Sequence, residues 1–186
     1  DLIDVAGQPA TSGSRVLAGR IADTDAPAIA RLRTQGAVLI GKVATTLTPM
    51  VANLARAGHE LYVHDLDAAR TQQVAGAHAV RAAASLSDLA AAEVVVTMLP
   101  NGHIVRDVYL GTCGLASTLG RGAIAVDMSS SDPAGTRALG AELAPFGITL
   151  VDAPGSGAVP RATNATLAIL IDGDDAAALE RVKPVL

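Results

Sequence analysis

Aromatic residues, cysteine and charge are all scarce in this chain of 186 residues. The only aromatic side chains are those of Tyr62, Tyr109 and Phe146, so the sequence offers no aromatic platform on which nucleic-acid bases could stack. The 14 basic residues are scattered and the net charge is −4, which argues against a nucleic-acid partner and against an acidic membrane surface. The single cysteine, Cys113, excludes an internal disulfide.

Long apolar runs and metal-ligand patterns are also missing. No uninterrupted apolar run reaches the ~20 residues of a membrane span, and the four histidines are dispersed. The first residues, DLIDVAGQPATSGSR, lack a basic segment followed by an apolar leader. We therefore expect a cytoplasmic protein with no membrane partner and no bound metal. Half of the residues (50 %) are hydrophobic, which excludes wholesale disorder and predicts a core of Val, Leu, Ile and Ala.

From Thr48 onward, short apolar runs alternate with helix-like segments. This alternation predicts an α/β fold in which a mostly parallel sheet carries helices on both faces, a doubly wound arrangement. Such sheets bind ligands beyond the carboxyl ends of their strands. Before Thr48, residues 1–25 read as loops and 26–35 as a helix. The expected strands are 37–41, 60–65, 78–82, 93–99, 123–128, 148–153 and 167–173; the main expected helices are 48–57, 67–75, 85–91, 102–110, 131–147 and 175–186.

Asp65 ends the second strand of the βαβ unit that begins at Ala37. It lies ~20 residues after the first turn, where a dinucleotide-binding fold places the acid that binds the ribose hydroxyls. A carboxylate at this position would repel the 2′-phosphate of NADP. The alternative is that Asp65 is a solvated turn residue that caps the next helix, a role that Asp67 could equally fill.

The phosphate-binding turn of a dinucleotide fold requires the pattern G-x-G-x-x-G between strand and helix. The corresponding segment here reads IGKVATTLTPM and contains only Gly41. Thr45 and Thr46 could offer hydroxyl and backbone N–H groups to a phosphate, or could merely precede and cap a helix. Three other residues stand where the glycines are expected when the helix start is used as the anchor: Lys42, Ala44 and Leu47.

Four later segments occur in a distinctive order: PMVANLARAGHELYVHDLD, TMLPNGHIVRDVYLG, VDMSSSDP and LVDAPGSGAVPRATNATLAILIDGD. Together they make the chain, from about residue 47 to 186, resemble the N-terminal domain of the β-hydroxyacid dehydrogenases, which include 3-hydroxyisobutyrate dehydrogenase and tartronate semialdehyde reductase. The resemblance implies a Rossmann-like fold that binds NAD(P) and transfers a hydride between nicotinamide and a small 3-hydroxy acid.

The resemblance also implies roles for particular residues. A substrate carboxylate would be held near Ser156 and Gly157. NAD is expected rather than NADP, because of the carboxylate of Asp65. The implied cofactor contacts are Asp65, Met98, Leu99, Pro100 and Ser130.

The chain departs from the family pattern at several positions. Besides the missing glycine turn, Ala158 and Ala165 stand where the family has glycines. The family's catalytic lysine, and the helical domain that closes the site, would lie beyond Leu186, so we assign no catalytic residue. Lys183 belongs to the preceding helix and is not that lysine.

Residues 1–46 resemble a different family, the amidase-signature hydrolases, through DLIDVAGQPATSGSRVLAG and DAPAIARLRTQGAVLIGKVATT. We therefore expect a chimera of two parts, 1–46 and 47–186, in which the strand at 37–41 can serve as the first strand of the sheet. Three functions remain open. They are a dehydrogenase domain that is incomplete in this chain, a catalytically silent nucleotide-binding or structural domain, and an amidase relic.

Overall fold

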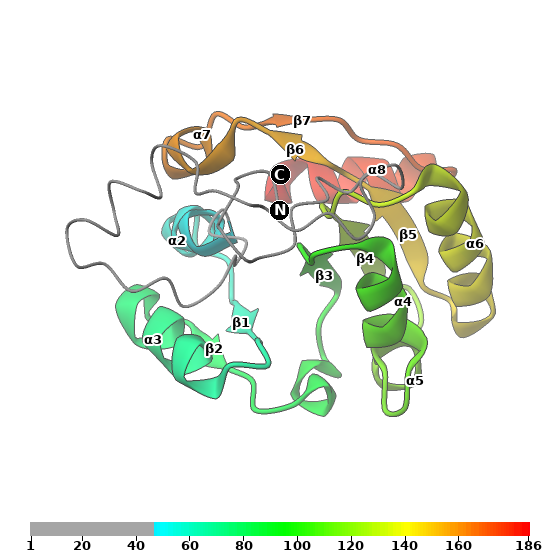
Figure 1. Cartoon of the computed structure of the whole chain (residues 1–186), viewed down its shortest axis with the longest axis horizontal. Helices are drawn as coiled ribbons and strands as arrows, with labels where there is room; N and C mark the ends of the chain where they lie inside the picture. Colours follow the sequence, from blue (N-terminus) through cyan, green and yellow to red (C-terminus); the bar gives the residue numbers. More distant parts are fainter. Residues whose placement is uncertain (1–46) are drawn as a thin grey trace, which may run out of the picture. The chain divides into compact units, whose positions relative to one another are not determined.

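A three-stranded parallel sheet organises the described part of the chain, residues 47–186 of the computed structural model (Figure 1). Its strands are β3 (Val94–Thr97), β4 (Ile124–Asp127) and β5 (Thr149–Asp152), in that spatial order. All four residues of the central strand β4 are buried. Complete burial of this kind is typical of a parallel strand that is covered on both faces. The β-branched residues of β3 alternate instead, with Val95 buried and Val94 and Val96 half-buried.

The first face of this sheet is covered by α4 (Gly102–Leu110), α5 (Leu115–Thr118) and α6 (Pro133–Leu143). Val95 and Ala125, which lie opposite each other in β3 and β4, contribute to this core. The helices contribute fully or almost fully buried side chains, including Tyr109, Leu115 and Leu143. Because side chains alternate between the faces of a strand, every second residue of β3 and β4 points into this cluster.

The opposite face carries a second core. Ile124 and Val126 of β4 and Val151 of β5 pack there against Ala178 and Val182 of α8 (Ala176–Val182), and Met50 of α2 (Leu47–Arg56) adds to it. Helices therefore cover both faces of the sheet, which confirms the predicted doubly wound arrangement.

A separate parallel pair is formed by β1 (Tyr62–Val63) and β2 (Arg81–Ala82), which pack against α3 (Ala68–His78). Strands β2, β1, β3, β4 and β5 match positions 3, 2, 4, 5 and 6 of the Rossmann strand order 3-2-1-4-5-6. The predicted single sheet is thus seen as two parallel sheets. The strand expected at 37–41, for position 1, lies outside the described residues, as does the helix expected at 26–35, and both stay predictions.

Helix α3 ends later than its sequence suggests. We expected Gly76 to stop the helix, but α3 continues through His78, and Ala79 takes the left-handed conformation (φ 53°) that closes it. The strand expected at 78–82 is therefore shortened to β2. Gly76 is exposed with open space around it, so neither packing nor strain ends the helix there.

The chain after β5 differs most from the prediction. A continuous strand was expected at 167–173, but β7 (Ala168–Ile169) is short, and Asp172 makes only an isolated bridge to Asp152. β7 pairs antiparallel with β6 (Gly155–Ser156), and α7 (Ala158–Thr163) joins them. Neither β6 nor α7 has the periodicity of a long element, so the sequence did not reveal them. Short 3₁₀ turns complete the chain: η1 (Leu86–Leu89), η2 (Ala144–Phe146) and η3 (Lys183–Val185).

Every helix within residues 47–186 is too short or too polar to traverse a lipid bilayer.

Two single substitutions at the end of α3, one at Gly76 and one at Ala79, should each stabilise the protein. Gly76→Ala, inside the helix, should raise the free energy of unfolding by about 1 kcal/mol. Ala79→Gly should raise it by about 0.5–1 kcal/mol, because glycine adopts the left-handed conformation without a Cβ penalty. Urea denaturation measures both. A loss of stability in Gly76→Ala would mean that the helix ends at Gly76 after all.

Candidate functional site

Three turns follow the carboxyl ends of β3, β4 and β5, where a doubly wound sheet binds its ligands. On one face of the sheet the last residues of these strands are polar: Thr97, Asp127 and Asp152 occupy paired positions. Thr97 and Asp127 are buried, whereas Asp152 is half-buried. The last residues of these apolar strands therefore form a row of polar groups at the edge of the sheet where the turns begin.

The carboxylate of Asp127 is only 1 % exposed and is bonded on both oxygens. The Thr97 hydroxyl donates to Oδ1 at 2.9 Å and the Ser129 backbone N–H donates to the same oxygen at 3.1 Å. The Ser131 hydroxyl donates to Oδ2 at 3.0 Å. One side chain thus holds both ends of the turn that contains Ser130.

The turns after β3 and β4 are also joined directly. The Leu99 N–H donates to the hydroxyl oxygen of Ser129 at 2.9 Å. A Cβ on Gly102 would lie 3.3 Å from the side chain of Ser131, so the two turns approach closely. The structure therefore brings the predicted cofactor residues of the two turns together. Met98 and Leu99 are half-buried, whereas Pro100 and Ser130 are exposed.

Asp65 follows β1 and is exposed. Of the two roles left open for it, helix capping belongs to Asp67, whose Oδ1 accepts from the N–H groups of Ala69 (3.0 Å) and Arg70 (3.2 Å). Oδ1 of Asp65 accepts only a local bond from the Asp67 N–H at 2.9 Å. The next side chain, Leu66, is 99 % exposed. An exposed carboxylate and an exposed apolar side chain therefore stand together at the end of β1.

The predicted substrate residues lie between β6 and α7. Ser156 is exposed, and Gly157 has φ +133°, a conformation that favours glycine. A Cβ on Gly157 would clash with Cδ of Arg161, so the Arg161 side chain covers this glycine. Helix α7 is tied to α2 because the Asn53 side-chain amide donates to the Ala162 carbonyl at 2.6 Å.

The phosphate turn is not part of the described structure. Thr45 and Thr46 lie outside it, as do Gly41, Lys42 and Ala44. Leu47, predicted at the third glycine position, is half-buried and begins α2.

Asp127, Ser129 and Tyr109 were not singled out by the sequence. A polar residue at the carboxyl end of a buried strand is the signal that could have indicated Asp127. The Tyr109 hydroxyl is buried without a hydrogen-bond partner among the described residues, and burial raises the pKa of Tyr109 well above its usual value. Nothing in the sequence distinguishes this tyrosine from an ordinary core residue of α4.

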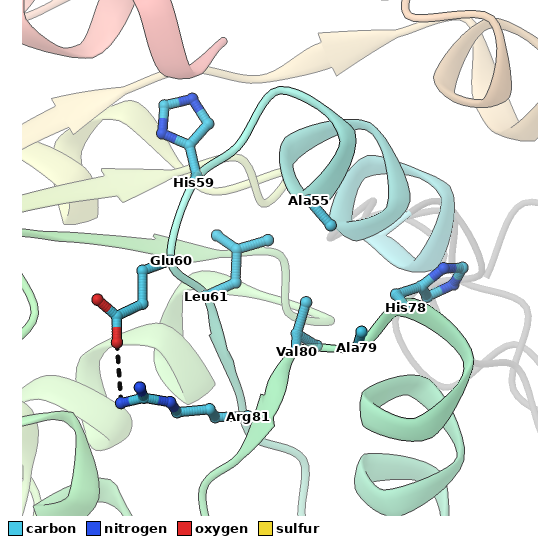
Figure 2. A pocket seen from close by; sticks show the side chains of 8 residues that line it. All are labelled: Ala55, His59, Glu60, Leu61, His78, Ala79, Val80 and Arg81. Atoms are coloured by element: carbon cyan, nitrogen blue, oxygen red, sulfur yellow. Dashed lines mark ion pairs between the residues drawn. The ribbon is translucent and has the colours of Figure 1, made fainter.

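A hollow of about 430 Å³ lies at the other end of β1 and β2, at the amino ends of these strands (Figure 2). Its charged rim is the exposed ion pair between Arg81 and Glu60, 2.8 Å apart. Within residues 47–186, no group of three metal-ligating side chains could hold a metal ion. The hollow contains no predicted site residue; it is lined by Ala55, His59, Glu60, Leu61, His78, Ala79, Val80 and Arg81.

Comparison with known protein families agrees with this geometry. The family described as the NAD binding domain of 6-phosphogluconate dehydrogenase matches residues 47–186, three-quarters of the chain. The chain belongs to this family. The amidase family matches residues 1–77, which confirms the second resemblance and extends it beyond residue 46.

Individual relatives are named as dehydrogenases and reductases. The chain is 34 % identical over 133 residues to 3-sulfolactaldehyde reductase of Escherichia coli (72 % of this chain, 44 % of the relative). It is 37 % identical to 3-hydroxyisobutyrate dehydrogenase of Pseudomonas aeruginosa over the same shares. A structure of Mycobacterium tuberculosis 3-hydroxyisobutyrate dehydrogenase with L-serine superposes with TM-score 0.70 and 34 % identity (77 % of this chain, 48 % of that one). The chain thus spans about half the length of the relatives it matches.

Both alanines that replace family glycines, Ala158 and Ala165, have φ 53°. Because this left-handed conformation costs a residue with a Cβ about 1–2 kcal/mol, Ala165→Gly should raise the free energy of unfolding by about 0.5–1 kcal/mol. Ala177→Gly, within α8, is the matched control and should lower it by a similar amount. Thermal and urea denaturation compare the two. Destabilisation by Ala165→Gly would contradict the prediction.

Asp152→Asn should stabilise the protein in a pH-dependent way. Burial raises the pKa of Asp152, and the carboxylates of Asp127 and Asp172 raise it further. A raised pKa means that the folded state holds the proton more tightly than the unfolded state, so ionisation of Asp152 destabilises the fold.

The gain from Asp152→Asn should therefore be present at pH 7, shrink as the pH falls through the raised pKa, and disappear once Asp152 is protonated in both states. Urea denaturation between pH 7 and pH 3 measures it. Asp107→Asn, at an exposed position on α4, is the control. A gain of the same size at every pH would show that ionisation of Asp152 does not oppose folding.

Proposed function

We propose that this chain is the NAD-binding part of a 3-hydroxyacid dehydrogenase. The carrying observation is the pair of turns after β3 and β4, which the Leu99–Ser129 bond and the Asp127 carboxylate join at the ligand-binding edge of the sheet. Family membership and the names of the relatives support the same proposal.

In this proposal the adenosine half of the cofactor lies at the end of β1. The Asp65 carboxylate accepts hydrogen bonds from the ribose hydroxyls, since Asp67 already provides the helix cap. The exposed side chain of Leu66 is adjacent to that site. A 2′-phosphate would meet the negative charge of Asp65, and therefore NAD is preferred over NADP.

The other half of the cofactor lies along the two joined turns, against Met98, Leu99, Pro100 and Ser130. Thr45 and Thr46 would face the phosphates. NAD, when bound, supplies the hydride acceptor. The residues around Ser156 and Gly157 hold the carboxylate of a small hydroxy acid, with the exposed Ser156 hydroxyl as a donor.

Proton removal from the substrate hydroxyl needs a positioned base. We do not assign this role to Lys183, which begins the turn η3 after α8 and whose exposed ammonium group pairs with Glu180. We assign no base within residues 47–186.

A catalytically silent nucleotide-binding domain is the second candidate. The observation that favours it is the replacement of glycines in the phosphate turn, which leaves Lys42, Ala44 and Leu47 where close backbone approach is needed. Calorimetric titration with NAD separates the two candidates, because the NAD-binding part of a dehydrogenase should bind NAD measurably, whereas a silent domain with an impaired phosphate turn should bind it weakly or not at all. A cytoplasmic location belongs to the proposal in both cases and suits the exposed thiol of Cys113.

Asp65→Asn should weaken NAD binding about tenfold, because a bond to a charged acceptor contributes about 1.5–3 kcal/mol, and should narrow the preference for NAD over NADP. Calorimetric titration of wild type and variant with both cofactors measures this. Asp175→Asn, at the N-cap of α8, is the matched control and should leave both affinities unchanged. Tighter binding of NADP by the wild type would overturn the role of Asp65, and binding of neither cofactor would overturn the proposed function.

A further inference from the structure

We infer that Asp127 is a positioning residue that holds the two cofactor turns in one arrangement. The inference rests on the proposed function and adds to it a residue that lies beneath the cofactor turns. Asp127 is almost fully buried, and its neighbours Ser129 and Ser131 flank the exposed Ser130.

A chain of hydrogen bonds connects Asp127 through Ser129 to Leu99. Its carboxylate accepts from the Ser129 N–H and the Thr97 hydroxyl, and Ser129 in turn accepts from the Leu99 N–H. Leu99 and Ser129 are 30 positions apart in the sequence and belong to different turns. Asp127 itself makes no bond to Leu99, so it acts on the first turn through Ser129.

This arrangement is costly for stability. Within residues 47–186, none of the ion pairs includes Asp127, and only hydroxyl and backbone N–H donors satisfy it. Burying a carboxylate without a cation is unfavourable. Its paired neighbour on β5 is Asp152, a second acid.

The surroundings of Asp127 add to the cost. The Tyr109 hydroxyl, in the core on this face of the sheet, is unpartnered within the described residues, and burial raises the pKa of Tyr109. What the carboxylate provides is the geometry of the two turns, and this is the property that cofactor binding uses.

Two measurements on the full chain test the inference. Hydrogen exchange of the Leu99 amide, followed by NMR, reports on the turn without any ligand, and calorimetry gives the dissociation constant for NAD. The variants are Asp127→Asn, which keeps the shape of the side chain but removes its charge and one of its two acceptor oxygens, and Ser129→Ala, which removes only the acceptor for Leu99. Leu143→Ala, a fully buried position on α6, is the control for general destabilisation.

Asp127→Asn and Ser129→Ala should each accelerate exchange of the Leu99 amide about tenfold more than the control does, and weaken NAD binding about tenfold. The double variant should weaken binding by much less than the product of the two single effects, because both act through one connection. Leu143→Ala should lower stability and leave NAD binding unchanged.

The inference would be overturned if the Leu99 amide exchanged no faster in Asp127→Asn than in the control. It would also be overturned if NAD affinity were unchanged in a variant whose Leu99 amide exchanges faster. In both cases NAD binding by the wild type would leave the proposed function standing. If Asp127→Asn does not fold, Ser129→Ala decides by the same two measurements. Absence of NAD binding by the wild type would remove the proposed function and the inference together.

Discussion

Burial of β4 on both faces and along both edges is the constraint on which the rest of this structure depends. With β3 and β5 as neighbours and helices on each face, no position of the strand can hold an unsatisfied polar group at acceptable cost. Polar residues are therefore confined to its carboxyl end, and the first of them is Asp127. The polar groups of the candidate site therefore start at the carboxyl end of β4.

The same constraint explains why the turns are built from short hydroxyl side chains. The Ser131 hydroxyl donates to Asp127 and the Ser129 hydroxyl accepts from the Leu99 N–H. Neither side chain fills the space between adjacent turns, where Gly102 already approaches Ser131 closely. A longer side chain in this space would separate the turns. The local geometry at this edge is thus fixed by buried polar hydrogen bonds.

Residues 47–77 are matched by both families, and the structure shows which fold these residues belong to. This stretch forms α2, β1 and most of α3. Asn53 on α2 binds the Ala162 carbonyl on α7, and β1 pairs in parallel with β2, outside the amidase match. The overlapping residues are therefore integrated into the nucleotide-binding fold, whatever sequence similarity they share with amidases.

Much of this architecture follows from the sequence by itself, because the signals are local. The N-caps Asp67, Asn101, Asp132 and Asp175 each bind backbone N–H groups two or three residues ahead, and apolar runs mark the buried strands. Only the tertiary structure decided the rest. Strands such as β7 extend as far as a partner allows, and the contacts that join Asp127, Ser129 and Leu99 form between segments distant in sequence, so no local pattern encodes them.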